Sequence, residues 1–199
     1  MITRKEMTRI LLKEGLLSCL ANNSFETVTV TSLCKASGIT RSTFYLHYSN
    51  IMEIVDDLVD DAIAYSKPGM VDNNNLQTIA NTLSAASNSV SLRGAYDSIF
   101  DRLPLCQRII RHKKYLPLFL DEQISEYVLQ RIIGREKDRQ GLVMAEALGI
   151  SFDVGVSVFV FLVHGLYAIN KEYKWSQSDA WLEAQKIIFE LVYRGLQSK

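Results

Sequence analysis

Two short helical segments separated by a glycine constrain the fold of this chain more than any other feature. The segments read TVTSLCKASG (29–38) and ITRSTFYLHY (39–48). Gly38 can adopt a positive φ without steric cost, so it can supply the sharp turn between two helices. Thr29 and Thr40 are good N-cap residues for the two helices. The pattern therefore predicts a helix-turn-helix in which the second helix is short.

Apolar residues recur with helical spacing along nearly the whole chain, and no stretch alternates like a strand. We therefore expect an all-α protein. A first helix is expected over about 4–21 and a fourth over 50–66, the latter begun by Asn50 with Glu53 in a pattern like a capping box. Further helices are expected over about 76–92, 95–103, 105–111, 117–134, 139–148, 152–173 and 179–196.

Charge is distributed unevenly between the two ends of the chain. Residues 1–48 contain six basic and three acidic side chains, whereas the rest contains 16 basic and 19 acidic ones. A basic head on a mildly acidic body fits a DNA-binding domain joined to a domain that does not bind DNA, although an excess of three charges also arises by chance. We expect domains over 1–49 and 67–199, connected by the helix over 50–66. The acidic side of that helix is expected to be a solvated face.

The helix-turn-helix and its flanks resemble the N-terminal DNA-binding domain of the TetR-type transcriptional regulators. The resemblance covers about the first 60 residues. It departs from the family at Ser24, where glycine is usual, and at Ile51 and Met52, where a lysine often contacts phosphate. The matching positions are Thr29, Leu33, Cys34, Gly38, Ile39, Thr40, Arg41, Thr43, Phe44, Tyr45 and Tyr48.

The resemblance implies a dimeric repressor that binds a palindromic DNA operator and is released by a small ligand. Arg41 suits bidentate recognition of guanine or, equally, a phosphate contact. Tyr45 and His47 resemble family positions that bond to backbone phosphates, whereas Phe44 and Tyr48 are expected in the core. The candidate DNA-binding residues are Thr29, Thr40, Arg41, Ser42, Thr43, Tyr45 and His47.

The last two helices are expected to form a dimer interface. The segment 152–167 has almost no polar side, as in a buried helix, and Gly155 and Gly165 would let another backbone come close. The resemblance implies that this helix pair meets its copy as a four-helix bundle, while the alternative is that both helices are core of one chain. The candidate interface residues are Phe159, Val163, Tyr167, Trp181, Ile188 and Val192.

A ligand pocket in the C-terminal domain is implied mainly by the resemblance. Its ligand would be small and apolar or aromatic, and the fourth helix would transmit its binding to the DNA-binding domain. Each candidate is also a plausible core residue, and His164 is a plausible core histidine. The candidates are Tyr96, Phe100, Tyr115, Phe119, Tyr127, Phe161 and His164.

Other functional classes find little support in the sequence. Cys19 and Cys34 fall on core-facing positions, Cys106 is the only plausible thiol sensor, and no CxxC or Cys/His cluster indicates a metal. No phosphate loop, GxSxG or HExxH indicates an enzyme, and no cofactor is expected. The start of the chain lacks the apolar run of a signal peptide, and the most apolar segment, 154–166, is too short to span a membrane, so we expect a cytoplasmic protein.

Two alternative functions fit the same pattern. The first keeps the fold but makes the protein a co-activator, or a regulator controlled by a partner protein. The second is a ligand-binding or interaction protein whose DNA-binding domain has decayed. The presence of Arg41, Tyr45 and His47 argues against decay.

Overall fold

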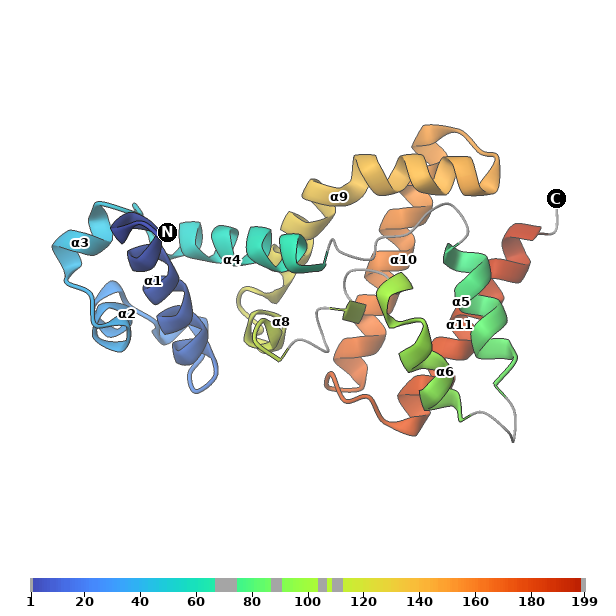
Figure 1. The fold of residues 1–199 in the computed structure, drawn as a ribbon, viewed down its shortest axis with the longest axis horizontal. Helices are drawn as coiled ribbons and strands as arrows, with labels where there is room; N and C mark the ends of the chain where they lie inside the picture. Colours follow the sequence, from blue (N-terminus) through green and yellow to red (C-terminus); the bar gives the residue numbers. More distant parts are fainter. Residues whose placement is uncertain (1, 67–74, 87–90, 104–106, 109–112, 198–199) are drawn as a thin grey trace. The chain divides into compact units, whose positions relative to one another are not determined.

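The computed structural model describes residues 2–66, 75–86, 91–103, 107–108 and 113–197, and every regular element in these ranges is helical. The expected all-α class is therefore confirmed for the described part of the chain (Figure 1). The chain divides into two units. The first unit contains Met1–Tyr65 and His112–Ile132, and the second contains Ser66–Arg111 and Ile133–Lys199.

This division differs from the expected domains, because a segment distant in sequence belongs to the first unit. The Asp121 carboxylate accepts the backbone N–H of Phe25 at 2.7 Å. The Lys114 ammonium lies 2.6 Å from the carboxylate of Glu14. Such partners distant in sequence leave no periodic trace, so the sequence did not reveal that 112–132 packs with the N-terminal helices.

The N-terminal helices begin and end where their capping residues predict. Thr29 accepts the N–H of Ser32 at 3.1 Å, and Thr40 accepts the N–H of Thr43 at 3.2 Å. Gly38 ends the second helix with a φ of 66°, and Asn50 accepts the N–H of Glu53 at 3.1 Å. The elements are α1 (Arg4–Leu20), η1 (Phe25–Thr27), α2 (Val30–Ser37), α3 (Arg41–Tyr45) and α4 (Ile51–Ser66).

The acidic side of α4 is bound to other helices, which corrects the expectation of a solvated face. Asp57 pairs with Arg9, and Asp61 pairs with Lys13, so α1 supplies both cations. Asp56 accepts the hydroxyl of Tyr127 at 2.6 Å. Opposite charges at complementary spacings on two packed helices attract each other, and the charge pattern of α4 alone did not show the partner.

The remaining elements differ from the sequence expectation mainly in length. Two expected helices, 117–134 and 139–148, are replaced by the short α8 and the long α9, which runs through Gly134 without a break. This helix of 24 residues tolerates two interior glycines, Gly134 and Gly141, at a cost of about 1 kcal/mol each. The expected helix over 105–111 lies largely outside the described residues. The elements are α5 (Asn75–Ser84), α6 (Leu92–Ser98), η2 (Phe100–Arg102), α8 (Leu116–Leu120), α9 (Ser125–Leu148), α10 (Phe152–Glu172) and α11 (Asp179–Gln197).

The core of the second unit lies between α5, α6, α10 and α11, and α5 lies along α11 (Figure 1). Its aromatic centre is the pair of Tyr96 and Trp181, whose ring centroids are 5.1 Å apart in an edge-to-face arrangement. Apolar side chains surround this pair, so burial of apolar surface stabilises the unit. The buried cluster contains Ile79, Leu83, Ala95, Tyr96, Ile99, Leu103, Leu166, Trp181, Leu182 and Phe189.

Helices α9 and α10 cross at the distance of backbone contact. A Cβ added to Gly155 would lie 2.3 Å from the carbonyl oxygen of Gly141, and one added to Gly141 would lie 2.4 Å from a methyl group of Val156. The expectation that Gly155 admits another backbone is therefore confirmed, but that backbone belongs to the same chain. A Cβ on Gly165 would meet no described atom within 4 Å.

Helix α10 is longer than the apolar run that the sequence displays. It has 21 residues and is long and apolar enough to cross a membrane by length and composition alone. This corrects the expectation that the segment is too short. The criterion is weak evidence, because the core helix of a soluble protein passes it as well.

Candidate nucleic-acid interface

Helix α3 is anchored on one side and exposed on the other. The Phe44 side chain is completely buried, and Tyr48 is 4% exposed just after the helix. Their rings lie 6.3 Å apart between centroids. Thr40, Arg41 and Ser42 are exposed at the start of the helix. The two aromatic anchors thus hold a short helix whose polar residues face solvent, while Phe44 and Tyr48 confirm the expected core positions.

Three hydroxyl groups form a local cluster at the start of α3. The Thr40 hydroxyl lies 3.0 Å from that of Ser42 and 2.9 Å from that of Thr43. Because Thr40 also caps the helix, its side chain is held in one orientation. Arg41 is exposed beside this cluster. The arrangement offers hydroxyl donors and one guanidinium on a common surface, a combination that suits phosphates and base edges.

The end of α3 presents a residue that the sequence analysis did not select. Leu46 is 81% exposed and follows Tyr45, which is 53% exposed. An exposed leucine next to the polar side of α3 can contact a thymine methyl group. The helical spacing gave no signal for it, because an exposed leucine has no periodic signature. His47 is half-buried, and its Nδ1 has no hydrogen-bond partner among the described residues.

Thr29 lies apart from α3, at the start of α2. Its side chain is exposed and closes a reciprocal capping box with Ser32. The structure therefore groups six of the seven predicted DNA-binding residues on α3 and the turn after it, with Thr29 at the neighbouring helix start.

Behind α3, a partly buried contact joins α1, α4 and the turn after α3. The Tyr48 hydroxyl donates to Asp57 at 2.5 Å, and the Arg9 Nε donates to the same hydroxyl at 3.2 Å. Burial, and then the hydrogen bond to Asp57, raises the pKa of Tyr48 well above its usual value. The contact fixes the turn after α3 against α1 and α4, so the exposed residues of α3 stand on a rigid support.

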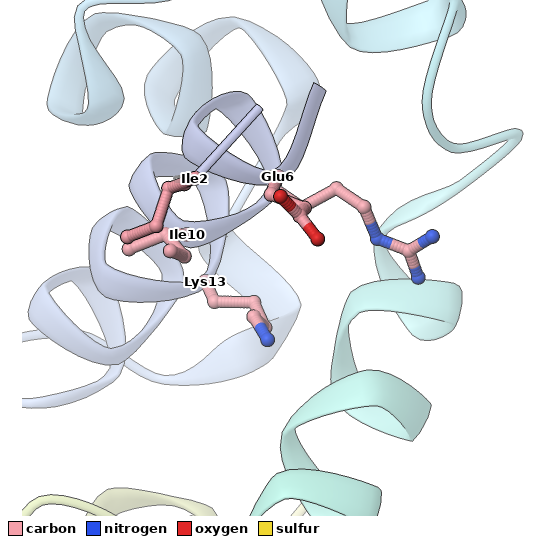
Figure 2. A pocket seen from close by; sticks show the side chains of 5 residues that line it. Ile2, Glu6, Ile10 and Lys13 are labelled. Carbon is pink, nitrogen blue, oxygen red and sulfur yellow. The ribbon is translucent and has the colours of Figure 1, made fainter. Parts of the chain in front are cut away.

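An open crevice of about 460 Å³ lies along α1 (Figure 2). Ile2, Glu6 and Ile10 line it together with Arg9 and Lys13. The two cations already pair with carboxylates of α4. The crevice therefore adds exposed apolar surface to the first unit but offers few free polar groups to a ligand.

The predicted ligand-pocket residues divide between the two units. Tyr115, Phe119 and Tyr127 belong to the first unit, whereas Tyr96, Phe100, Phe161 and His164 belong to the second. Tyr115, Phe119 and Tyr96 are buried in the cores of their units.

Three of the predicted pocket residues have other surroundings. Phe161 is 71% exposed, and Tyr127 bonds to Asp56 at the surface. The His164 Nδ1 lies 2.9 Å from the carbonyl oxygen of Val160, as expected of a histidine satisfied within its own helix. The predicted ligand pocket stays a prediction.

Most of the predicted dimer residues are buried within the single chain. Phe159, Val163, Tyr167 and Trp181 are each less than a tenth exposed within the single chain, so they cannot offer a large surface to a partner. Ile188 packs against the core of the second unit, and Val192 is half-buried.

Other residues of α10 and α11 present the exposed apolar surface. Phe161 and Leu191 are each 71% exposed, and the smaller contributions come from Phe152, Val154 and Ile187. A continuous apolar run cannot reveal which of its sides faces the core, so the sequence did not distinguish these exposed residues from the buried ones.

The described cysteines are structural. Cys34 is buried and Cys19 half-buried, and burial raises the pKa of both thiols. A thiol with a raised pKa holds less reactive thiolate at neutral pH. Cys106 lies outside the described residues. Within the described part of the chain, no group of three His, Cys, Asp or Glu side chains could hold a metal ion.

Comparisons with protein-family models, with curated proteins and with solved structures found no match for this chain.

Proposed function

We propose that this protein is a DNA-binding transcriptional regulator, a dimeric repressor that binds a two-fold symmetric operator and is released by a small ligand. The observation that carries the proposal is the construction of α3. Two buried aromatic side chains anchor the helix, and its opposite side presents Thr40, Arg41, Ser42 and Tyr45 to solvent. The resemblance of this segment to TetR-type regulators supports the same function.

The preceding helices support the docking of α3 in a major groove. Gly38 adopts the left-handed conformation that a tight turn between two helices needs. Arg41 would contact guanine or a phosphate, and Leu46 would contact a thymine methyl group. The rigid contact behind α3 reduces the entropy lost on binding, because the presenting helix is already ordered.

Dimerisation is proposed through the exposed apolar surface of α10 and α11. Val154, Phe161 and Ala168 recur at helical spacing on one exposed side of α10, with Ile187 and Leu191 exposed on α11. A second copy would cover these side chains, and two-fold symmetry would provide two recognition helices for two half-sites.

Release by a ligand would involve α9 as well as α4. Helix α4 is bound to α1 by two ion pairs within the first unit. The helix that passes from the first unit into the second is α9, whose residues divide between them after Ile132. A ligand bound in the second unit would therefore change the separation of the recognition helices through α9, provided that it binds one conformation better than the other. We place this activity in the cytoplasm.

Binding of a duplex that the protein selects from a random pool tests the proposal. Arg41→Ala should weaken binding by about 1–3 kcal/mol or relax base preference at one position. Tyr45→Phe should weaken binding to all sequences alike, since it removes a phosphate contact. Lys137→Ala is the matched control, because Lys137 is an exposed cation of the second unit. Binding by both test variants equal to that of the control would reject the assignment of α3.

The assembly has a test of its own. Phe161→Asp places a charge on a side chain that is 71% exposed, so the monomer should fold while the dimer dissociates. Val163→Asp should unfold the protein, because that side chain is 5% exposed within one chain. A folded Phe161→Asp variant that sediments as a dimer would reject this interface.

A further inference from the structure

The core of the second unit contains a connected set of neutral polar side chains. The Tyr96 hydroxyl donates to Gln107 at 3.2 Å, and the Gln107 amide donates to Gln185 at 3.2 Å. The Trp181 indole N–H donates to the Asn170 carbonyl oxygen at 2.9 Å. Gln107, Gln185 and Asn170 have no exposed surface. Burial of three amides in an apolar core is costly unless their hydrogen bonds are made.

Three donors of this set have no partner among the described residues. They are the Asn170 Nδ2, the Gln185 Nε2 and the Tyr167 hydroxyl. The indole donor of Trp181 fixes the oxygen of Asn170 toward α11, so the Asn170 nitrogen cannot exchange places with it. Each unsatisfied buried group destabilises the fold. Three such groups in one core call for acceptors that the described residues do not supply.

Helix geometry places Tyr167 and Gln185 on one side of the hydrogen bond between Asn170 and Trp181. The chain reverses direction between the end of α10 and the start of α11. The turn of α10 before Asn170 and the turn of α11 after Trp181 therefore extend in the same direction from the hydrogen bond that joins these two residues. Tyr167 and Gln185 occupy those two turns and therefore lie on the same side of the Asn170–Trp181 hydrogen bond. One helical turn rises about 5.4 Å, which is the length of a molecule of a few bonds.

Aromatic rings surround these donors. The ring centroid of Tyr167 lies 5.6 Å from that of Trp175, and the ring of Tyr96 packs on Trp181. Trp175 is buried although its φ is +58° and that of Lys174 is +49°. Such left-handed conformations cost non-glycine residues about 1–3 kcal/mol each, and they persist where the surroundings hold them. The turn thus holds Trp175 beside Tyr167.

We infer that the donors of Tyr167, Asn170 and Gln185 form a binding site for a small, uncharged molecule with carbonyl-type oxygens and a flat apolar body. This site would receive the effector of the regulator proposed above, and in that role it rests on the proposed function. The set is made of donors without ionised members, so it suits neutral acceptors. A ligand with a carboxylate would need a cation beside it. The buried Arg108, which follows Gln107 in the chain, already has an interaction of its own.

Acetophenone is a suitable probe, with ethylbenzene as its isostere without an acceptor and benzoate as its charged counterpart. In the full-length protein without DNA, acetophenone should shift the side-chain amide NMR signals of Asn170 and Gln185. A dissociation constant on the order of 1 mM suits nine non-hydrogen atoms. Ethylbenzene and benzoate should bind more weakly and leave these amide signals in place.

Tyr167→Phe separates a ligand contact from a structural role. It should weaken acetophenone binding about two- to tenfold, the effect of one net hydrogen bond, while the urea midpoint of the free protein stays the same or rises, because an unpartnered hydroxyl is removed. Tyr173→Phe, a half-buried tyrosine near the same turn, is the matched control and should leave affinity unchanged. A lower urea midpoint for Tyr167→Phe, or equal binding of acetophenone and ethylbenzene, overturns the inference.

Acetophenone that does not bind at a concentration of about 20 mM, 20-fold above the expected dissociation constant, also overturns the inference. Ordered water would then satisfy the three donors. This experiment contains no DNA. Failure of operator binding would therefore reject the proposed function but not the binding site. Failure of probe binding would reject the binding site but not the proposed function.

Discussion

Replacement of Gly155 by alanine should destabilise the second unit, because the added Cβ would meet backbone atoms. It would lie 2.3 Å from the Gly141 carbonyl oxygen and 2.9 Å from the Ala145 nitrogen. Ordinary contacts begin at about 3.4 Å, so α9 and α10 must separate by on the order of 1 Å. Forcing packed helices apart costs typically about 1–3 kcal/mol.

A second glycine provides a matched control. A Cβ on Gly134, inside α9, would meet no described atom within 4 Å. Both replacements gain the same helix propensity of about 1 kcal/mol for alanine over glycine. The propensity therefore cancels in the comparison, and Gly155→Ala should unfold with about 1–3 kcal/mol less free energy than Gly134→Ala.

Urea denaturation followed by circular dichroism measures the difference. Gly141→Ala should behave like Gly155→Ala, since its Cβ would meet Val156 on the facing helix. Equal unfolding free energies for Gly155→Ala and Gly134→Ala would refute the reasoning, because the two helices could then not cross at backbone contact.

Three further variants test other parts of the structure. Because the pKa of Tyr48 is raised, its contribution to stability is complete below about pH 10 and is lost as the pH rises further. Urea denaturation between pH 8 and 11 should therefore show a free energy of unfolding that declines at alkaline pH, and Tyr48→Phe should reduce this decline. Asp121→Ala leaves the Phe25 N–H without its acceptor, and the urea midpoint should fall with a loss of about 1–3 kcal/mol, partly restored by Asp121→Asn. Thr40→Ala removes the cap of α3 and should cost about 1 kcal/mol in thermal denaturation.

Local interactions made the N-terminal helices predictable from sequence. Thr29, Thr40 and Asn50 cap their helices through hydrogen bonds to residues three positions on, so the signal lies within one turn. Gly38 marks its turn because few other residues adopt a positive φ without cost. Phe44 was predictable as core for a similar reason, since its position is fixed relative to the turn.

Long-range contacts explain what the sequence could not show. Asp57 reads as one member of an acidic run until Arg9, 48 positions earlier, is placed beside it. Val163 and Phe161 are both apolar and two positions apart, but one is core and the other is exposed. Only the packing of the folded chain distinguishes them. Leu46 was missed because a surface leucine has no periodic signature.

The central claim is that two copies of α3 bind a two-fold symmetric DNA site, and selection of duplexes from a random pool tests it most directly. The selected sequences should contain an inverted repeat whose half-site centres lie about 10–10.5 base pairs apart, or a multiple of that, so that both helices enter major grooves on one face. Affinity for that duplex should fall steeply with salt, because neutralised phosphates release counterions. A pool that yields no enriched sequence, or an enriched site without two-fold symmetry, would contradict the account.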